Sequence, residues 1–173
     1  MFDTIMVPTD GSDHAARALA AAIDLTARYD ASLIVLHVAL HHASAEEVEH
    51  ILNGSDIPPS IRRDIDRLHH VSAPIPVGGS GGHHTLSQAL SEHIGQHITM
   101  TAVAAAEKAG IRRVVSRVVS GSPTKRIVVV ARAEDVKLLV MGTRGLGGLQ
   151  SLFHGSVSQS VRQTCHCACL TMP

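Results

Sequence analysis

Residues 2–38 read FDTIMVPTDGSDHAARALAAAIDLTARYDASLIVLHV, and three patterns follow one another in this segment. Phe2–Val7 is a short apolar run closed by a proline, which predicts a buried strand and then a turn. Apolar residues then recur at helical spacing to about Tyr29, with Ser12 or Asp13 available as the N-cap. Ser32–Val38 is a second β-rich apolar run. Strand, helix and strand in succession predict a βαβ unit.

The C-terminal half repeats this alternation. Strands are predicted at Arg113–Val119, Lys137–Met141 and Cys167–Met172, and helices at 124–134 and 156–164. The first of these helices contains a valine-rich run with strand propensity, but Ser122 followed by Pro123 is a helix start. Strands that are nearly continuous in apolar residues indicate a parallel sheet covered on both faces. We therefore expect an α/β fold, with an open five-stranded parallel sheet and helices on both faces.

The segment after the second strand departs from this rhythm. We expect residues 1–173 to form one domain that carries a histidine-rich insertion at about 41–84. Within the insertion, 46–52 and 60–68 have the pattern of short amphipathic helices, and 74–82 is rich in proline and glycine. A longer helix, from about 85 to 109, then returns the chain to the sheet.

The composition argues against several classes of partner. Lys plus Arg and Asp plus Glu each total 15, and aromatic residues make up 2% of the chain with no Trp. Neither an electrostatic attraction to nucleic acid nor a base-stacking platform is therefore expected. There is no basic leader, and no run approaches the roughly 20 apolar residues of a membrane span. We expect a cytoplasmic protein that contacts neither nucleic acid nor membrane.

The glycine-rich segment that follows Met141 is the main candidate for ligand binding. In open parallel sheets, ligands bind beyond the carboxyl ends of the strands, which directs attention to Pro8–Asp10, Val38 and the residues from Gly142 onward. Glycines allow backbone N–H groups to approach an anion, and a helix start follows at Ser156. Neither the G-x-x-x-x-G-K-[ST] phosphate loop nor a G-x-G-x-x-G after the first strand is present. Spacing alone leaves a phosphate-binding loop and an ordinary surface loop equally open.

A family resemblance separates these alternatives. The arrangement Gly142-x2-Gly145-x9-Gly155-Ser156 resembles the G-2x-G-9x-G-(S/T) motif of ATP-binding universal stress proteins. The resemblance extends to Ile5–Ser12, the His37-Val38 strand end, the Gly121-Ser122-Pro123 turn and Val140–Gly142. It implies a Rossmann-like fold similar to that of the adenine nucleotide alpha hydrolases.

The resemblance also implies a set of nucleotide-binding residues: Pro8, Thr9, Asp10, Val38, Met141, Gly142, Gly145, Gly155, Ser156 and Val157. The first three would line the adenine and ribose side, with Val38 in the base pocket, and the last four would take the phosphates. The implied ligand is ATP, with Mg²⁺ or Mn²⁺ bound through the phosphates. No catalytic constellation is evident, so at most slow hydrolysis or autophosphorylation is expected. Asp10 has an alternative role as an ordinary turn or cap residue.

Two departures from the family pattern stand out. His154 replaces the usual aliphatic residue before the glycine, and the last strand reads Cys167-Ala168-Cys169-Leu170 where the family typically has Cys-Pro-Val-Leu. In the family this strand commonly pairs with its two-fold mate. The resemblance therefore implies a homodimer formed through the C-terminal strand.

Histidines and cysteines suggest a different class of function. Nine of the 13 histidines lie between His41 and His97, and His93 and His97 have i,i+4 spacing, but no third metal ligand is identifiable. Three cysteines alternate at 165, 167 and 169, which in an extended strand would place all three on one face. Buried small hydrophobes are the plainer reading of these cysteines. Two alternatives stay open: a stress protein of the same fold that binds no nucleotide, and a metal- or redox-responsive protein using the insertion and Cys165, Cys167 and Cys169.

Overall fold

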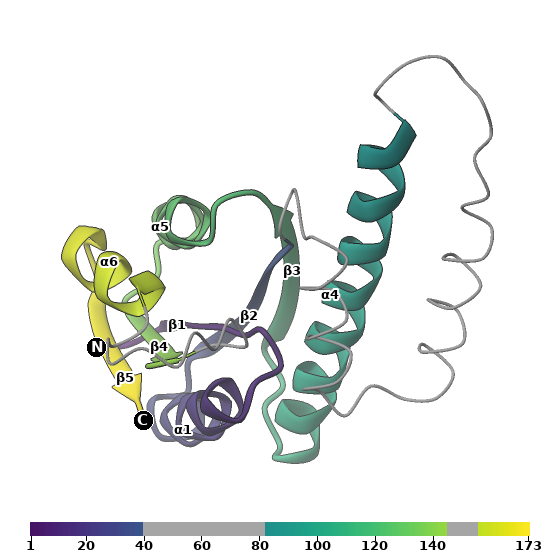
Figure 1. Ribbon diagram of the computed structural model, residues 1–173. Coiled ribbons are helices and arrows are strands. Elements are labelled where there is room, and N and C mark those ends of the chain that lie inside the picture. The colour runs from purple at the N-terminus through teal and green to yellow at the C-terminus, as the bar shows by residue number, and fades with distance from the viewer. Residues whose placement is uncertain (40–81, 145–155) are drawn as a thin grey trace.

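Five strands form one sheet in the order β3-β2-β1-β4-β5, and every neighbouring pair is parallel (Figure 1). The computed structural model describes residues 1–39, 82–144 and 156–173. The strands are β1 (Thr4–Pro8), β2 (Ser32–Ala39), β3 (Val114–Ser120), β4 (Leu138–Gly142) and β5 (Ala168–Met172). The helices are α1 (Asp13–Tyr29), α4 (Gly82–Lys108), α5 (Pro123–Ala133) and α6 (Ser156–Thr164). The expected α/β fold is confirmed.

Local sequence signals account for the helix ends. The Ser12 hydroxyl accepts a hydrogen bond from the Ala15 amide at 3.2 Å, which caps α1. Proline occupies the first turn of α5, as expected from Ser122-Pro123. The valine-rich run in α5 is helical because it buries one stripe: Ile127 and Ala131 lie in the core, whereas Val129 is 56% exposed.

Each face of the sheet carries its own apolar core. Ile5 and Val7 face α1 and α4, whose contacting residues are mostly alanines, so these helices lie close to the strands. Met6 points the opposite way, toward α5 and α6. The chain therefore leaves β1 toward one face and β4 toward the other. These adjacent strands form the topological switch point of the sheet.

Some predicted boundaries differ from the structure. Helix α4 begins at Gly82, three residues before its expected start, because no proline interrupts the pattern there. The two short helices predicted at 46–52 and 60–68 lie outside the described residues. The last strand starts at Ala168, one residue after its predicted start at Cys167, so Cys165 and Cys167 lie before the strand. Only Cys169 lies in β5, because α6 ends at Thr164 and the chain must turn before it can pair with β4.

None of the helices in the ranges 1–39, 82–144 and 156–173 is long and apolar enough to cross a bilayer.

Candidate functional site

The turn that follows β1 is held by its own polar side chains. The Thr9 amide donates to the Leu36 carbonyl at 2.8 Å, which ties the turn to β2. The Ser12 amide donates to Asp10 Oδ1 at 3.0 Å, so the alternative role of Asp10 as a turn residue is observed. Gly11 has φ +85°, a conformation in which a side chain would be strained. A carboxylate offers about four acceptor positions, so this turn bond leaves Asp10 able to accept from a ligand as well.

His37 links the carboxyl ends of β1 and β2. Its Nδ1 lies 2.9 Å from the Thr9 carbonyl oxygen, which can only accept, so Nδ1 carries the proton. Burial lowers the pKa of His37, and the opposing effects of the Thr9 hydrogen bond and the Asp10 charge are smaller. The ring is therefore neutral at pH 7. The sequence placed His37 only within a family motif. A polar histidine inside an otherwise apolar strand is the sequence signal that could have pointed to this role in positioning the turn after β1.

Gly142, the last residue of β4, lies against the first turn of α1. A Cβ on Gly142 would be 2.8 Å from the His14 carbonyl carbon and 2.9 Å from the His14 Cβ. Glycine is therefore required for this close approach between β4 and α1. Nδ1 of His14 is buried, with no hydrogen-bond partner in the described part of the chain. Sequence reasoning did not single out His14, because no local pattern reveals a backbone approach between residues this far apart.

The first turn of α6 lies at the same edge of the sheet. The Ser158 hydroxyl donates to the Thr143 carbonyl at 3.3 Å, directly after β4, and the Thr143 amide donates to the Met172 carbonyl at 2.8 Å. The amides at a helix N-terminus carry partial positive charge and attract anions. This arrangement places the amino end of α6 beside the end of β4.

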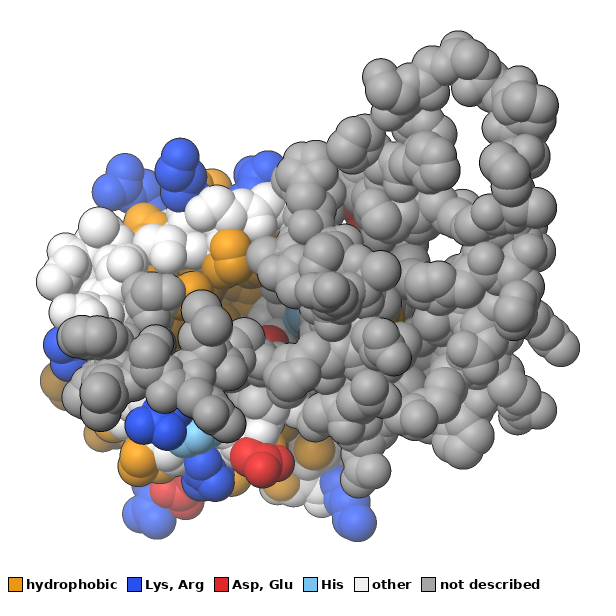
Figure 2. All heavy atoms as spheres, in the orientation of Figure 1, with side chains coloured by type: hydrophobic (Ala, Val, Ile, Leu, Met, Phe, Trp, Pro, Cys, Tyr) orange, Lys and Arg blue, Asp and Glu red, His pale blue; other side chains and the backbone are white. Residues whose placement is uncertain are grey.

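Apolar side chains from three elements adjoin these polar groups. Met141 is buried in the cluster between the sheet and α5 and α6, and Val38 and Val157 pack against that cluster. Figure 2 shows, near the centre of the face viewed, a hollow in which hydrophobic and acidic side chains are visible. The edge therefore offers apolar surface, a carboxylate and a helix N-terminus together.

Most of the residues predicted from the sequence meet at this edge. Within the described ranges they are Pro8, Thr9, Asp10, Val38, Met141, Gly142, Val157 and, as the first residue of α6, Ser156. Gly145, Gly155 and His154 lie outside the described residues. The described residues of the candidate set therefore lie at the ends of β1, β2 and β4 and at the start of α6.

A second recess, of about 430 Å³, lies at the opposite, amino edge of the sheet, between the ends of α1 and α4. Two of its charged groups pair with each other: Arg113 forms an ion pair with Asp30 at 2.9 Å and donates to the Asp30 carbonyl. No set of polar groups converges there on a ligand, so the carboxyl edge is the stronger candidate.

The cysteines lie apart from this edge: Cys165 and Cys167 follow the end of α6, and Cys169 is the second residue of β5. All three thiols are free and half-buried. Burial, reinforced by the neighbouring thiol of Cys165, raises the pKa of Cys167 to about 12 and also raises that of Cys169. Oxidant-sensing cysteines have lowered pKa values, so Cys167 and Cys169 do not fit that class.

Comparison with known families places the chain in a defined group. The sequence model of the universal stress protein family matches residues 1–59 and 61–173. A universal stress protein of Thermus aquaticus is 31% identical over 170 residues, which cover 98% of each chain. A second relative, the universal stress protein MJ0531 of Methanocaldococcus jannaschii, is 27% identical, over 99% of this chain and 82% of its own.

Solved structures agree on the fold. The universal stress protein UspA of Lactobacillus plantarum superimposes with a TM-score of 0.69 at 18% identity, covering 99% of this chain and 98% of its own. A universal stress protein in complex with cAMP gives 0.63 at 23% identity, covering 99% and 97%. An Arabidopsis thaliana family member with AMP bound gives 0.58 at 19% identity, covering 98% and 90%.

Proposed function

The chain belongs to the universal stress protein family, and on that premise we propose that it is a regulatory protein that binds an adenine nucleotide at the carboxyl edge of β1, β2 and β4. The observation that carries the proposal is the convergence, at the switch point of the sheet, of the Asp10 turn, the close-packed Gly142 and the start of α6. Structural neighbours solved with cAMP and AMP add support for an adenine ligand.

Each part of the edge takes a different part of the nucleotide. Val38 offers apolar surface to the base, Met141 and Gly142 flank the ribose, and Asp10 accepts hydrogen bonds from the ribose hydroxyls. His37 holds the Thr9 carbonyl in place and thereby orients the turn that bears Asp10. The phosphates lie at the amino end of α6, beside Gly142, with Gly145, Gly155 and Ser156 completing their site.

We propose ATP with Mg²⁺ or Mn²⁺ as the ligand. The segment 142–158 contains no lysine, and Arg144 is its one arginine. One arginine and the dipole of a helix cannot neutralise the negative charge of a triphosphate. A divalent cation bound to the phosphates supplies the remaining positive charge. The sequence shows no nucleophile with an identifiable base, so we expect a nucleotide-dependent state with little or no turnover.

The proposal extends to assembly and location. Strand β5 is an edge of the sheet, and Leu170 on it is 37% exposed. An apolar edge strand favours pairing with a second copy, in line with the homodimer implied by the family pattern. We place this homodimer in the cytoplasm.

Titration calorimetry on the full, untagged chain tests the ligand. We expect ATP with Mg²⁺ to bind more tightly than ATP in EDTA, and AMP to bind without any effect of Mg²⁺, because a monophosphate needs less charge compensation. GTP is the control for base recognition and should bind more weakly than ATP.

The outcomes separate the alternatives. Equal ATP affinity in EDTA would remove the cation from the proposal while leaving the adenine site. Absence of binding by ATP, AMP and cAMP to the folded chain would favour a stress protein of the same fold that binds no nucleotide.

A further inference from the structure

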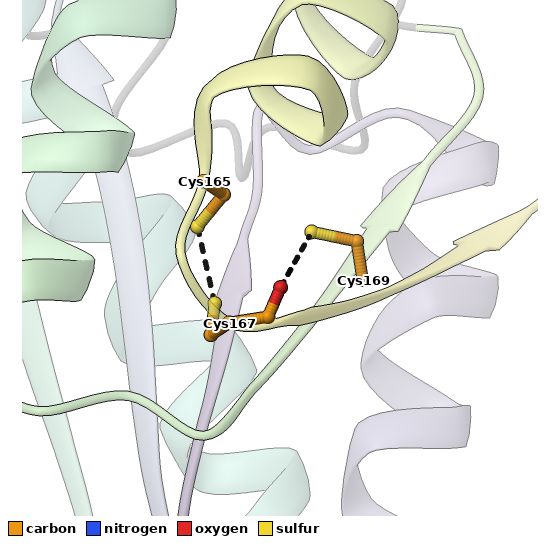
Figure 3. A group of neighbouring side chains, drawn as sticks. All are labelled: Cys165, Cys167 and Cys169. Carbon is orange, nitrogen blue, oxygen red and sulfur yellow. Dashed lines mark hydrogen bonds between the residues drawn. The ribbon is translucent and has the colours of Figure 1, made fainter.

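The three cysteine sulfurs converge on one point. Their Sγ atoms all lie within 4.8 Å of one another, and those of Cys165 and Cys167 are 3.1 Å apart (Figure 3). The turn between α6 and β5 produces this arrangement. The Cys165 amide continues the helical pattern by donating to the Val161 carbonyl at 2.7 Å, and the Cys169 thiol then reaches back to the Cys167 carbonyl at 3.6 Å.

The cluster is partly enclosed. All three cysteines pack against the apolar core between the sheet and the helices α5 and α6, and each is neither fully buried nor fully exposed. A site of this kind is dry enough to favour metal–sulfur bonds and open enough for an ion to enter. The nucleotide edge lies at the other end of α6, since that helix begins at Ser156 and ends at Thr164.

We propose that Cys165, Cys167 and Cys169 form a three-thiolate binding site for a soft metal ion, Cu(I). Soft sulfur ligands select Cu(I), zinc and iron–sulfur clusters over hard cations such as Mg²⁺. With metal–sulfur bonds of about 2.3 Å, three sulfurs in a trigonal plane are about 4.0 Å apart. The cluster reaches this spacing if the Cys165 and Cys167 sulfurs, which are 3.1 Å apart, move further apart by less than about 1 Å.

The number of ligands favours Cu(I) over zinc. In the described ranges, no histidine, aspartate, glutamate or fourth cysteine joins the three sulfurs as a possible ligand. Structural zinc sites are almost always four-coordinate, whereas Cu(I), a monovalent d¹⁰ ion, is satisfied by three thiolates. Each thiol loses its proton to solvent as its sulfur binds, and the ion keeps its oxidation state, so the step needs no oxidant or reductant.

An anaerobic Cu(I) titration against the competing chelator bicinchoninate tests the site. These are the three cysteines of the whole chain, which has no Trp and one Tyr, so a thiolate-to-copper absorption band arises against a low background. We expect one Cu(I) per chain, with Cys167→Ser and Cys169→Ala each weakening binding at least tenfold and removing the band. The matched control is His166→Ala, which removes an exposed imidazole that lies between two of the cysteines in sequence but outside the sulfur cluster, and it should bind as the parent does.

Melting curves on each variant show whether the fold survives. If Cys167→Ser unfolds, Cys169→Ala still tests the site. Parent-like Cu(I) affinity in a folded cysteine variant would overturn the proposal. Displacement of Cu(I) by an equal amount of Zn²⁺ would overturn the three-coordinate assignment. Loss of binding in His166→Ala would show that the ligand set is wrong.

Discussion

His37 is held neutral between two strands, and this gives the protein a pH-dependent stability. Its folded-state pKa lies below the ordinary value of 6.5 because the ring is buried. Below about pH 6.5 the unfolded chain therefore binds more protons at this position than the folded chain does. The contribution of His37 to stability is complete above pH 6.5 and is lost as the pH falls toward the folded pKa. The slope of this loss is at most about 1.4 kcal/mol per pH unit.

His37→Asn removes the titration and retains a donor near the position of Nδ1. We expect the free energy of unfolding, measured by urea denaturation from pH 7.5 to 5, to decline less steeply in His37→Asn than in the parent. The exposed His166→Asn is the matched control and should follow the parent. Parallel pH profiles for the parent and His37→Asn would contradict a buried neutral imidazole.

Helix α4 packs on β2 and β3 through a glycine in its interior. A Cβ on Gly95 would lie 2.5 Å from Cδ2 of His37 and 3.1 Å from Cγ1 of Val118. The His37 ring cannot move aside without losing its bond to Thr9. Glycine costs about 1 kcal/mol of helix propensity relative to alanine, and the fit against the ring outweighs that cost.

Gly95→Ala therefore tests how tightly α4 is seated. Although alanine favours helix, we expect a destabilisation of about 1–3 kcal/mol from overpacking, measured by denaturant unfolding. Gln96→Ala changes the adjacent, exposed position and should be neutral or slightly stabilising. A Gly95→Ala variant as stable as Gln96→Ala would mean that α4 shifts freely on the sheet.

Elements with strong local signals were predictable from the sequence, and long-range contacts were not. The caps and apolar stripes of α1 and α5 identify them as helices because those signals act within a few residues. The turn before β5 was missed because alternating cysteines look the same in a strand and in a turn. The contacts of Gly95 with His37 and of Gly142 with His14 join residues far apart in the chain.

In the molecule as a whole, parallel topology brings three distant segments to one edge. The rule that ligands bind beyond the carboxyl ends of parallel strands pointed to that edge from the sequence. Eight of the ten predicted binding residues lie in the described ranges, at the ends of β1, β2 and β4 or the start of α6. The His14 and His37 contacts were added by the structure, since only the packed chain places their rings.

The central claim is that an adenine nucleotide binds at this edge, and an isosteric pair of substitutions tests it most directly. Asp10 follows β1 at the proposed ribose site, whereas Asp13 is exposed in the first turn of α1. Both Asp10→Asn and Asp13→Asn remove one negative charge, and asparagine can still accept the bond from the Ser12 amide. Each should therefore stay folded in a melting curve.

The measurement is the calorimetric affinity for AMP of the parent and both variants. Losing the charge from a hydrogen-bonded partner costs about 1.5 kcal/mol, so we predict that Asp10→Asn binds AMP roughly tenfold more weakly while Asp13→Asn matches the parent. Equal affinity of all three proteins, or a loss confined to Asp13→Asn, would contradict a nucleotide site at the carboxyl edge of β1, β2 and β4.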